Sequence, residues 1–393
     1  MKSSAPSVAP KVMPRVMLRV AILAADQPGF VSPMAKGLQK MLSAVGAEAE
    51  IFSQGLAMLN FSTAGQVKTL VKNRLKAIVN QVQPQRFLLQ PQVSATEVKQ
   101  FLAHLSGFDV IVVVCHIPDA FLAAKLSGIE KIRQNATTQQ SIPIVLYQNY
   151  YLATRGDWYQ KIKGADGFGL ERYDWYFAAS VVSEYPLSSE CHPYSHIGHD
   201  LADGSLYVEP TKAQLPFKVL LDFERPGFEQ YRLLQIEALE KTNTPYTQLR
   251  GRYSLADIRA IYRAHSALFL SFRESFGLPI VENQLCGNTI FAPYISWVPS
   301  HQLDKPLSQA GLGTVGRNFK LYDNQLEPLM AQIEHCRDNY QPDQVVADFQ
   351  QQYPQLAGGD LVALQGFVDK VANGEISGCS HQHHGALNDG ISG

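Results

Sequence analysis

Short apolar runs alternate with amphipathic helical segments along this chain, and that alternation restricts its fold more than any other feature. The first five runs lie at 19–26, 47–52, 108–118, 142–149 and 174–182. They are largely hydrophobic, as strands are when helices cover both faces of a parallel sheet. Between the first two runs, apolar side chains recur at helical spacing from Met34 to Val45, and Gly46 follows as a stop. The alternation predicts an α/β fold with parallel sheets.

The same alternation restarts beyond residue 210. The segment 206–218 carries proline and polar residues typical of a linker. A second series of apolar runs follows at 217–223, 246–251, 266–272, 288–294 and 316–323. Because 393 residues exceed what one hydrophobic core supports, we expect two Rossmann-like domains that face each other across a cleft.

The expected boundaries follow from these two series. The first domain spans 16–210 and the second spans 211–340. Helices at 341–375 are expected to cross back to the first domain. The ends, 1–15 and 376–393, are expected to be disordered tails, the latter because it is rich in Gly, Ser and His.

Composition narrows the classes of partner and the location. The formal net charge of −1 gives no electrostatic reason to expect nucleic acid as a partner, and we expect no nucleic-acid partner. Five scattered cysteines indicate a reduced, cytoplasmic chain, and no apolar run approaches the ~18 residues needed to cross a bilayer. The basic residues Lys11, Arg15 and Arg19 of KVMPRVMLR (11–19) leave peripheral contact with the inner membrane face as an alternative to a plain tail and strand start.

Two glutamates stand eight positions apart in RESFGLPIVENQLCGN (273–288). Glu274 precedes a tight turn, and Glu282 lies inside the helix that follows. The segment comes directly after the apolar run at 266–272, so it lies at the carboxyl end of a predicted strand, where ligands of open α/β sheets bind. Ionised carboxylates accept hydrogen bonds, and neighbouring hydroxyls such as those of ribose can donate them.

The turn between these glutamates favours an anion. Pro279 suits the first helical position, and Gly277 lets a ligand approach the backbone closely. We expect the amides of Phe276, Gly277 and Leu278 to point into the cleft, where a helix N-terminus attracts negative charge. Carboxylates that accept from hydroxyls, together with backbone amides that donate to phosphate, predict a site for a nucleotide sugar.

The stretch SFRESFGLPIVENQLCGN resembles the E-x7-E motif of retaining glycosyltransferases of the GT-B fold, of the family-4 (group 1) type. The resemblance implies that Glu274 contacts the donor sugar and that Glu282 holds the nucleotide ribose. It also implies transfer from a nucleoside-diphosphate sugar to a hydroxyl of a glycan, lipid-linked or protein acceptor, with retention of configuration. The sequence has no Asp-x-Asp metal signature, and we expect neither a metal nor a cofactor.

Two further stretches resemble the acceptor domain of this family. PGFVSPMAKGLQKML (28–42) is similar to its first loop and helix, with Gly29 in the place of a glycine pair. FDVIVVVCHIP (108–118) is similar to the end of its fourth strand, which implies that His116 lies near the transferred sugar. A structural role for His116 is the equal alternative.

The diphosphate segment departs from the family pattern. In LLDFERPGFEQYR (220–232), Arg225 matches the arginine that binds the diphosphate, but Glu224 replaces a glycine and Gln230 a lysine. Arg232 and Arg252 are candidates for the missing charge. The change leaves open a non-catalytic GT-B binding or assembly protein, and a sugar-nucleotide epimerase or phosphorylase is a third alternative. Between the apolar run at 217–223 and residue 254 only about one helix and one strand fit, whereas the family usually has additional strands and helices there. We therefore expect donor recognition to be reduced or unusual.

A cluster of possible metal ligands occurs in CHPYSHIGHD (191–200). Its spacing matches no zinc pattern, and Pro193 and Gly198 predict a loop. We therefore interpret the cluster as structural.

Overall fold

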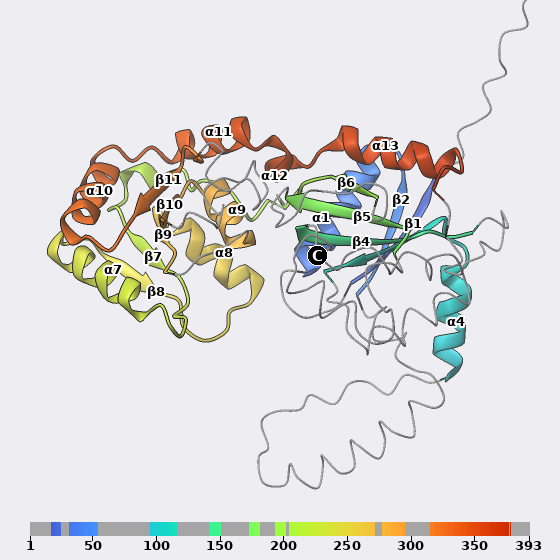
Figure 1. Ribbon diagram of the computed structural model, residues 1–393, viewed down its shortest axis with the longest axis horizontal. Helices are drawn as coiled ribbons and strands as arrows, with labels where there is room; N and C mark the ends of the chain where they lie inside the picture. The colour runs from blue at the N-terminus through green and yellow to red at the C-terminus, as the bar shows by residue number, and fades with distance from the viewer. Residues whose placement is uncertain are drawn as a thin grey trace, which may run out of the picture.

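The structure is a computed structural model that describes residues 17–24, 31–53, 95–115, 141–150, 173–180, 193–201, 204–271, 277–294, 315–376 and 378. The described residues form two parallel sheets, which lie side by side in Figure 1. The first has the order β2-β1-β3-β4-β5-β6, with β1 Arg19–Leu23, β2 Glu48–Phe52, β3 Val110–Val114, β4 Ile144–Tyr150, β5 Trp175–Ser180 and β6 Tyr194–His196. The second has the order β11-β10-β9-β7-β8, with β7 Val219–Leu221, β8 Tyr246–Gln248, β9 Ala267–Phe269, β10 Thr289–Pro293 and β11 Phe319–Tyr322.

Helices cover these sheets. Those beside the first sheet are α1 Val31–Ala44 and α4 Ala95–Leu105, and those of the second sheet are α7 Glu229–Lys241, α8 Leu255–Arg263, α9 Leu278–Leu285 and α10 Leu326–Asp338. Three helices close the described chain: α11 Pro342–Gln352, α12 Pro354–Gly358 and α13 Leu361–Ala372. The predicted fold class is confirmed: both halves are α/β units of Rossmann type built on a parallel sheet.

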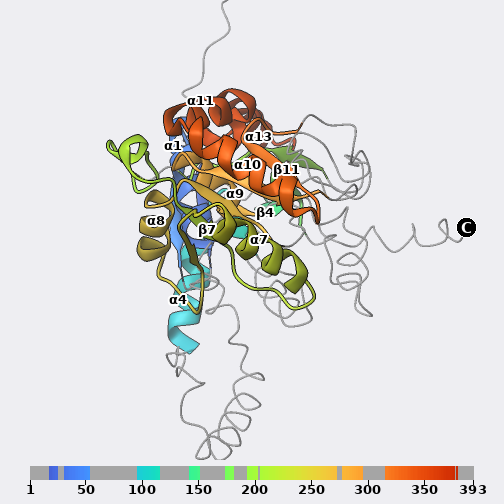
Figure 2. The same ribbon diagram turned by 90° about the vertical axis from the view of Figure 1, so that its left-hand side faces the viewer.

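The second sheet shows how the sequence places its helices. Strand side chains alternate between faces, so Val219 and Leu221 pack in one core and Leu220 in the other. The first core takes side chains from α7 and α10, and the second takes them from α8 and α9. Figure 2 shows α7 and α10 on one side of the strands and α8 on the other. With both faces covered, only the strand ends remain for a ligand.

The C-terminal helices run from the second sheet to the first, along the top of Figure 1, as expected. Beside the second sheet, Pro342 at the start of α11 packs on Gly287, just after α9. Over the first sheet, the rings of Phe367 and Phe177 lie 4.7 Å apart. A backbone bond from His199 N to the Gln355 carbonyl (2.8 Å) ties α12 to the loop after β6. We call α11, α12 and α13 the strap.

The loop prediction for 191–200 is wrong at one point, because Tyr194–His196 form β6, an edge strand parallel to β5. The Pro193 carbonyl accepts a hydrogen bond from Tyr176 N (3.0 Å), and Trp175 Nε1 donates to Ser195 Oγ (3.0 Å). Three residues without an apolar run give no periodic signal. The strand exists because the neighbouring strand offers its edge.

The tail expected from residue 376 is described only at its start. Ile376 is buried, and Ser141 Oγ donates to the Gly378 carbonyl at 2.6 Å. The remainder of both expected tails lies outside the described residues.

Candidate functional site

The strand order of the second sheet marks one place for a ligand. β7 and β9 are neighbours, and the chain leaves β7 toward β8 on one side before returning to β9 on the other. Ligands of open α/β sheets bind beyond the carboxyl ends of the strands at such a switch point. Asp222 directly follows β7 and Ser271 lies two residues after β9, so both stand at this point.

Helix α9 begins beside the switch point, as the sequence predicts. Gly277 is its N-cap in an extended conformation (φ −134°, ψ 136°), and Pro279 lies in its first turn. Glycine brings no side chain to cap the helix, so its positive end is open to a ligand anion. The Leu278 side chain is buried, and the residue can therefore offer a ligand only its backbone. Phe276 and Glu274 lie outside the described residues.

Glu282 lies in the second turn of α9 and is 5% exposed. Its Oε1 accepts hydrogen bonds from Arg259 Nε at 3.0 Å and from Arg259 Nη2 at 2.7 Å. Arg259, on α8, is also buried, and its Nη1 donates to Ser205 Oγ at 2.8 Å. A charged pair with two hydrogen bonds fixes the orientation of the Glu282 carboxylate before any ligand arrives.

The sequence analysis missed Arg259. Arg259 lies on the same face of α8 as Tyr262, three residues later, and both are buried. A charged side chain on a buried helix face needs a partner, and this was the signal in the sequence.

Arg225 and Glu224 are exposed in the loop after β7, which ends where Gly227 (φ +85°) leads into α7. Gln230 is exposed in the first turn of α7. The structure therefore keeps the Arg225 matched by the sequence near the carboxyl edge of the sheet, and it puts both departures from the family pattern on the surface beside it.

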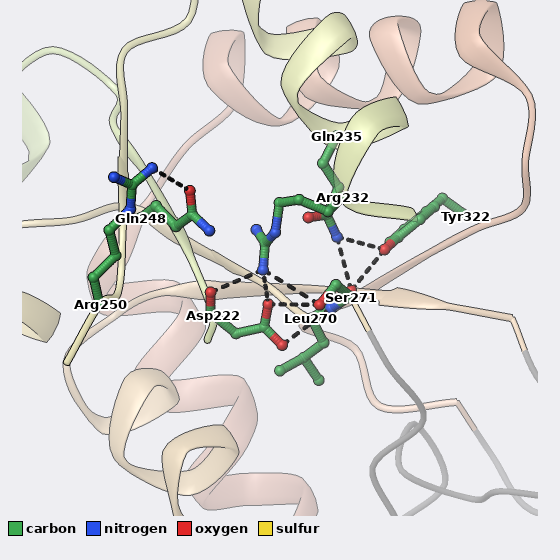
Figure 3. Close-up of polar contacts among 8 residues, drawn as sticks. All are labelled: Asp222, Arg232, Gln235, Gln248, Arg250, Leu270, Ser271 and Tyr322. Atoms are coloured by element: carbon green, nitrogen blue, oxygen red, sulfur yellow. Dashed lines mark hydrogen bonds and ion pairs between the residues drawn. The ribbon is translucent and has the colours of Figure 1, made fainter. Parts of the chain in front are cut away.

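A buried polar cluster fills the switch point itself (Figure 3). Arg232 reaches from α7 and forms an ion pair with the Asp222 carboxylate. Its Nη2 also donates to the Asp222 carbonyl (2.8 Å) and to Ser271 Oγ (3.3 Å). Ser271 in turn donates to Asp222 from its amide (3.1 Å) and its hydroxyl (2.9 Å). The cluster joins the carboxyl ends of β7 and β9.

Two opposing effects act on the pKa of Asp222 in this cluster. Burial raises the pKa of Asp222, and the Arg232 charge and the Ser271 hydrogen bonds act in the other direction. All the groups that Asp222 contacts here are donors, which suits an ionised carboxylate. Among the described residues, Arg232 Nε and Nη1 have no hydrogen-bond partner, although Arg232 is only 4% exposed.

Exposed rings and an arginine stand in the loops that follow β7 and β8. The rings of Phe223 and Tyr253 lie 6.1 Å apart. The Arg250 amide donates to Tyr253 Oη (3.1 Å), and Arg250 Nη2 donates to Gln248 Oε1 (3.2 Å). Such a surface can stack on a planar base.

On the acceptor side, Gly29 and His116 lie outside the described residues. Cys115, the last described residue after β3, has a positive φ of 50°. Burial raises the pKa of its thiol far above the usual range. Within the described ranges, no group of three His, Cys, Asp or Glu residues could hold a metal ion. No helix there is long and apolar enough to cross a membrane.

Comparison with known proteins gives a fold and no sequence family. No protein-family model and no curated protein sequence matches the chain. An alpha-glucosyltransferase in complex with UDP and a 13-mer DNA shares 12% identity over 91% of this chain and 100% of its own, with a TM-score of 0.55. An alpha-glucosyltransferase in complex with UDP-glucose and DNA containing an abasic site shares 11% identity over 91% of this chain and 100% of its own, with a TM-score of 0.53.

Anabaena Alr3699/HepE in complex with UDP and glucose gives 14% identity, 91% and 100% coverage and a TM-score of 0.49. At 11–12% identity the likeness to the alpha-glucosyltransferase shows the fold alone, which is the two-domain fold of GT-B glycosyltransferases.

One expectation from composition is contradicted. The prediction of no nucleic-acid partner from the net charge of −1 is wrong as an exclusion, because the alpha-glucosyltransferase of this fold is in complex with DNA. A net charge is a sum over the whole surface, and it does not report the sign of a local groove. The net charge alone therefore does not exclude nucleic acid as a class of partner.

Proposed function

We propose that this chain is a retaining glycosyltransferase that moves a sugar from a nucleoside-diphosphate sugar to an acceptor hydroxyl without a metal ion. One observation carries the proposal: at the switch point of the second sheet, an uncapped helix start lies one turn before a buried carboxylate held in place by Arg259. An anion and a hydroxylated ring, joined as in a nucleotide sugar, match that pair of features.

The proposed roles follow from position. Residues 211–340 form the donor domain and 16–210 the acceptor domain. Glu282 binds the ribose hydroxyls and Glu274 the donor sugar. Arg225 and the amides of Phe276, Gly277 and Leu278 stabilise the leaving diphosphate. The rings of Phe223 and Tyr253 offer a stacking surface for the base.

On the acceptor side, Gly29 belongs to the acceptor-side loop, and His116 lies near the transferred sugar. Catalysis then consists of positioning the two substrates and stabilising the charge on the departing phosphate, which takes the acceptor proton on the same face. The acceptor supplies a hydroxyl, and its candidate classes are a glycan, a lipid-linked molecule, a protein and, because the alpha-glucosyltransferase of this fold is in complex with DNA, a nucleic acid.

The test is calorimetry with UDP, GDP, ADP and their sugar conjugates, on wild type and Glu282→Gln. Glutamine keeps an oxygen for Arg259 and removes the charge that a ribose diol would meet. A hydrogen bond to a charged group contributes about 1.5–3 kcal/mol, so we expect nucleotide affinity to fall by about 10- to 100-fold.

Glu209→Gln is the matched control, because Glu209 also pairs with an arginine of α8, Arg263, at 3.1 Å but is half-exposed. It should leave nucleotide affinity unchanged. Equal affinity of wild type and Glu282→Gln for the nucleotide that binds would contradict the ribose assignment.

A non-catalytic binding or assembly protein of this fold is the second candidate. Two observations favour it: Glu224 and Gln230 are exposed beside Arg225, and the nearby buried cation Arg232 is paired with Asp222. The double change Glu224→Gly with Gln230→Lys separates the two functions. Stronger donor binding and new turnover in that variant would support the non-catalytic reading of wild type. Turnover by wild type with an acceptor would refute it, and turnover of donor alone, or of donor with phosphate, would indicate an epimerase or a phosphorylase.

A further inference from the structure

The guanidinium of Arg232 is only partly used by the protein. Its Nη2 makes all of the hydrogen bonds described above, to Asp222 and Ser271. Nε and Nη1 are buried and have no partner among the residues that the structure describes. An unmet buried donor costs about 1–3 kcal/mol, and more for a charged group, so a native site with two of them calls for a partner.

The place of these donors indicates what that partner is. Arg232 touches the residues that follow both β7 and β9, so its guanidinium lies at the switch point where ligands of such sheets bind. Arginine meets two oxygens of a phosphate through neighbouring N–H groups. Each such pair in arginine includes Nη2, so in Arg232 the unpartnered Nε or Nη1 would act together with Nη2, which already donates to Asp222 and Ser271.

The charge of Arg232 is not available in full, because Asp222 occupies the same guanidinium. The Asp222 carboxylate is 6% exposed and accepts from Arg232 and twice from Ser271. Its negative charge also lies at the strand end that an incoming diphosphate must approach. The pair therefore attracts an anion less than Arg232 alone would.

We propose that Arg232 is a diphosphate-binding cation of the donor site and that Asp222, by pairing with it, sets the affinity for the donor. This inference rests on the proposed function. It assigns to Arg232 the positive charge that Gln230 lacks, and it makes Asp222 a positioning residue that holds the guanidinium and limits its attraction for phosphate.

The experiment compares wild type, Asp222→Asn and the double variant Asp222→Asn with Arg232→Gln in calorimetry with UDP, GDP and ADP and with the corresponding nucleosides. Asparagine preserves the size and an acceptor oxygen but removes the charge. We expect Asp222→Asn to bind the preferred nucleoside diphosphate about tenfold more tightly, which corresponds to about 1.4 kcal/mol. The double variant should lose this gain and bind more weakly than wild type. Nucleoside affinity should not change, because a nucleoside has no phosphate.

Asp323→Asn is the matched control, since Asp323 follows β11 as Asp222 follows β7 but is exposed. It should leave affinity within about twofold of wild type, because solvent screens an exposed charge. Where Asp222→Asn does not fold, as judged by thermal unfolding, Asp222→Ser carries the same expectation.

Each other outcome is decisive. Wild-type binding with unchanged affinity in Asp222→Asn overturns the inference and leaves the proposed function standing. A gain that persists in the double variant, or that Asp323→Asn reproduces, overturns the role of Arg232. Failure of wild type and all variants to bind any of the three diphosphates overturns the proposed function, and the inference with it.

Discussion

The pair of Glu282 and Arg259 makes a strong prediction about stability, and that prediction decides how the site can be tested. The two side chains are 7% and 1% exposed, and two hydrogen bonds from Arg259 end on Glu282 Oε1. Removing one partner of a buried ion pair leaves the other charge without compensation, at a cost of about 3–5 kcal/mol. We therefore expect Glu282→Ala to lower the free energy of unfolding by about that amount.

Two further variants separate charge from packing. Glu282→Gln keeps an oxygen that both Arg259 donors can reach, so its loss should be about 1–3 kcal/mol. The double variant Glu282→Leu with Arg259→Met removes both charges and keeps apolar volume, and it should be more stable than Glu282→Ala. The half-exposed pair of Arg263 and Glu209 is the control, because Glu209→Gln should cost no more than about 1 kcal/mol.

Urea unfolding followed by tryptophan fluorescence measures these differences as shifts of the transition midpoint at a common slope. A loss below about 1 kcal/mol in Glu282→Ala, equal to that of Glu209→Gln, would refute the reasoning, because the pair would then be solvated. The expected loss also explains why nucleotide binding is best compared with Glu282→Gln. In Glu282→Ala, weak binding and partial unfolding would look alike.

Two further predictions concern the strap and a buried lysine. Gly198→Ala should lower the free energy of unfolding by at least ~2 kcal/mol more than Gly46→Ala, because a Cβ at Gly198 would lie 1.7 Å from the Gln355 carbonyl oxygen of the strap. Gly46 also has a positive φ but has open space around it, so it controls for backbone strain. Equal losses in thermal unfolding would contradict the close packing of the strap on Gly198. Burial lowers the pKa of Lys212 to about 8 from 10.5. Between those values the unfolded chain binds the extra proton, so the free energy of unfolding should rise with pH by up to roughly 3 kcal/mol. Urea unfolding of wild type against Lys212→Met measures that rise, and an unchanged difference across this range would contradict it.

The sheets were predictable because their central strands are short, almost entirely apolar runs of sequence. Val110–Val114 and Ile144–Leu146 are buried on both faces of a parallel sheet, and such strands consist almost entirely of apolar residues. The helix starting at Leu278 was predictable from Gly277 and Pro279, which are local signals. β6 was not, because its three residues carry no pattern and depend on an edge offered by β5.

The polar contacts at the site were less predictable, since their partners lie far apart in the sequence. Arg259 and Glu282 are 23 positions apart, and Asp222 and Ser271 are 49 apart. A periodic pattern shows that a charged residue faces the interior but does not name the group that compensates it. Asp222 did leave a trace, as an acid within the apolar run FKVLLDF at 217–223. Such an acid signals a buried pair.

The central claim is that the switch point of the second sheet binds a nucleoside-diphosphate sugar, and a crystal structure of wild type with the tightest-binding nucleoside diphosphate tests it most directly. The account predicts the diphosphate at the start of α9, within hydrogen-bond distance of the Leu278 amide, and the ribose hydroxyls on the Glu282 carboxylate. A nucleotide bound elsewhere, or a ribose with no contact to Glu282, would contradict it.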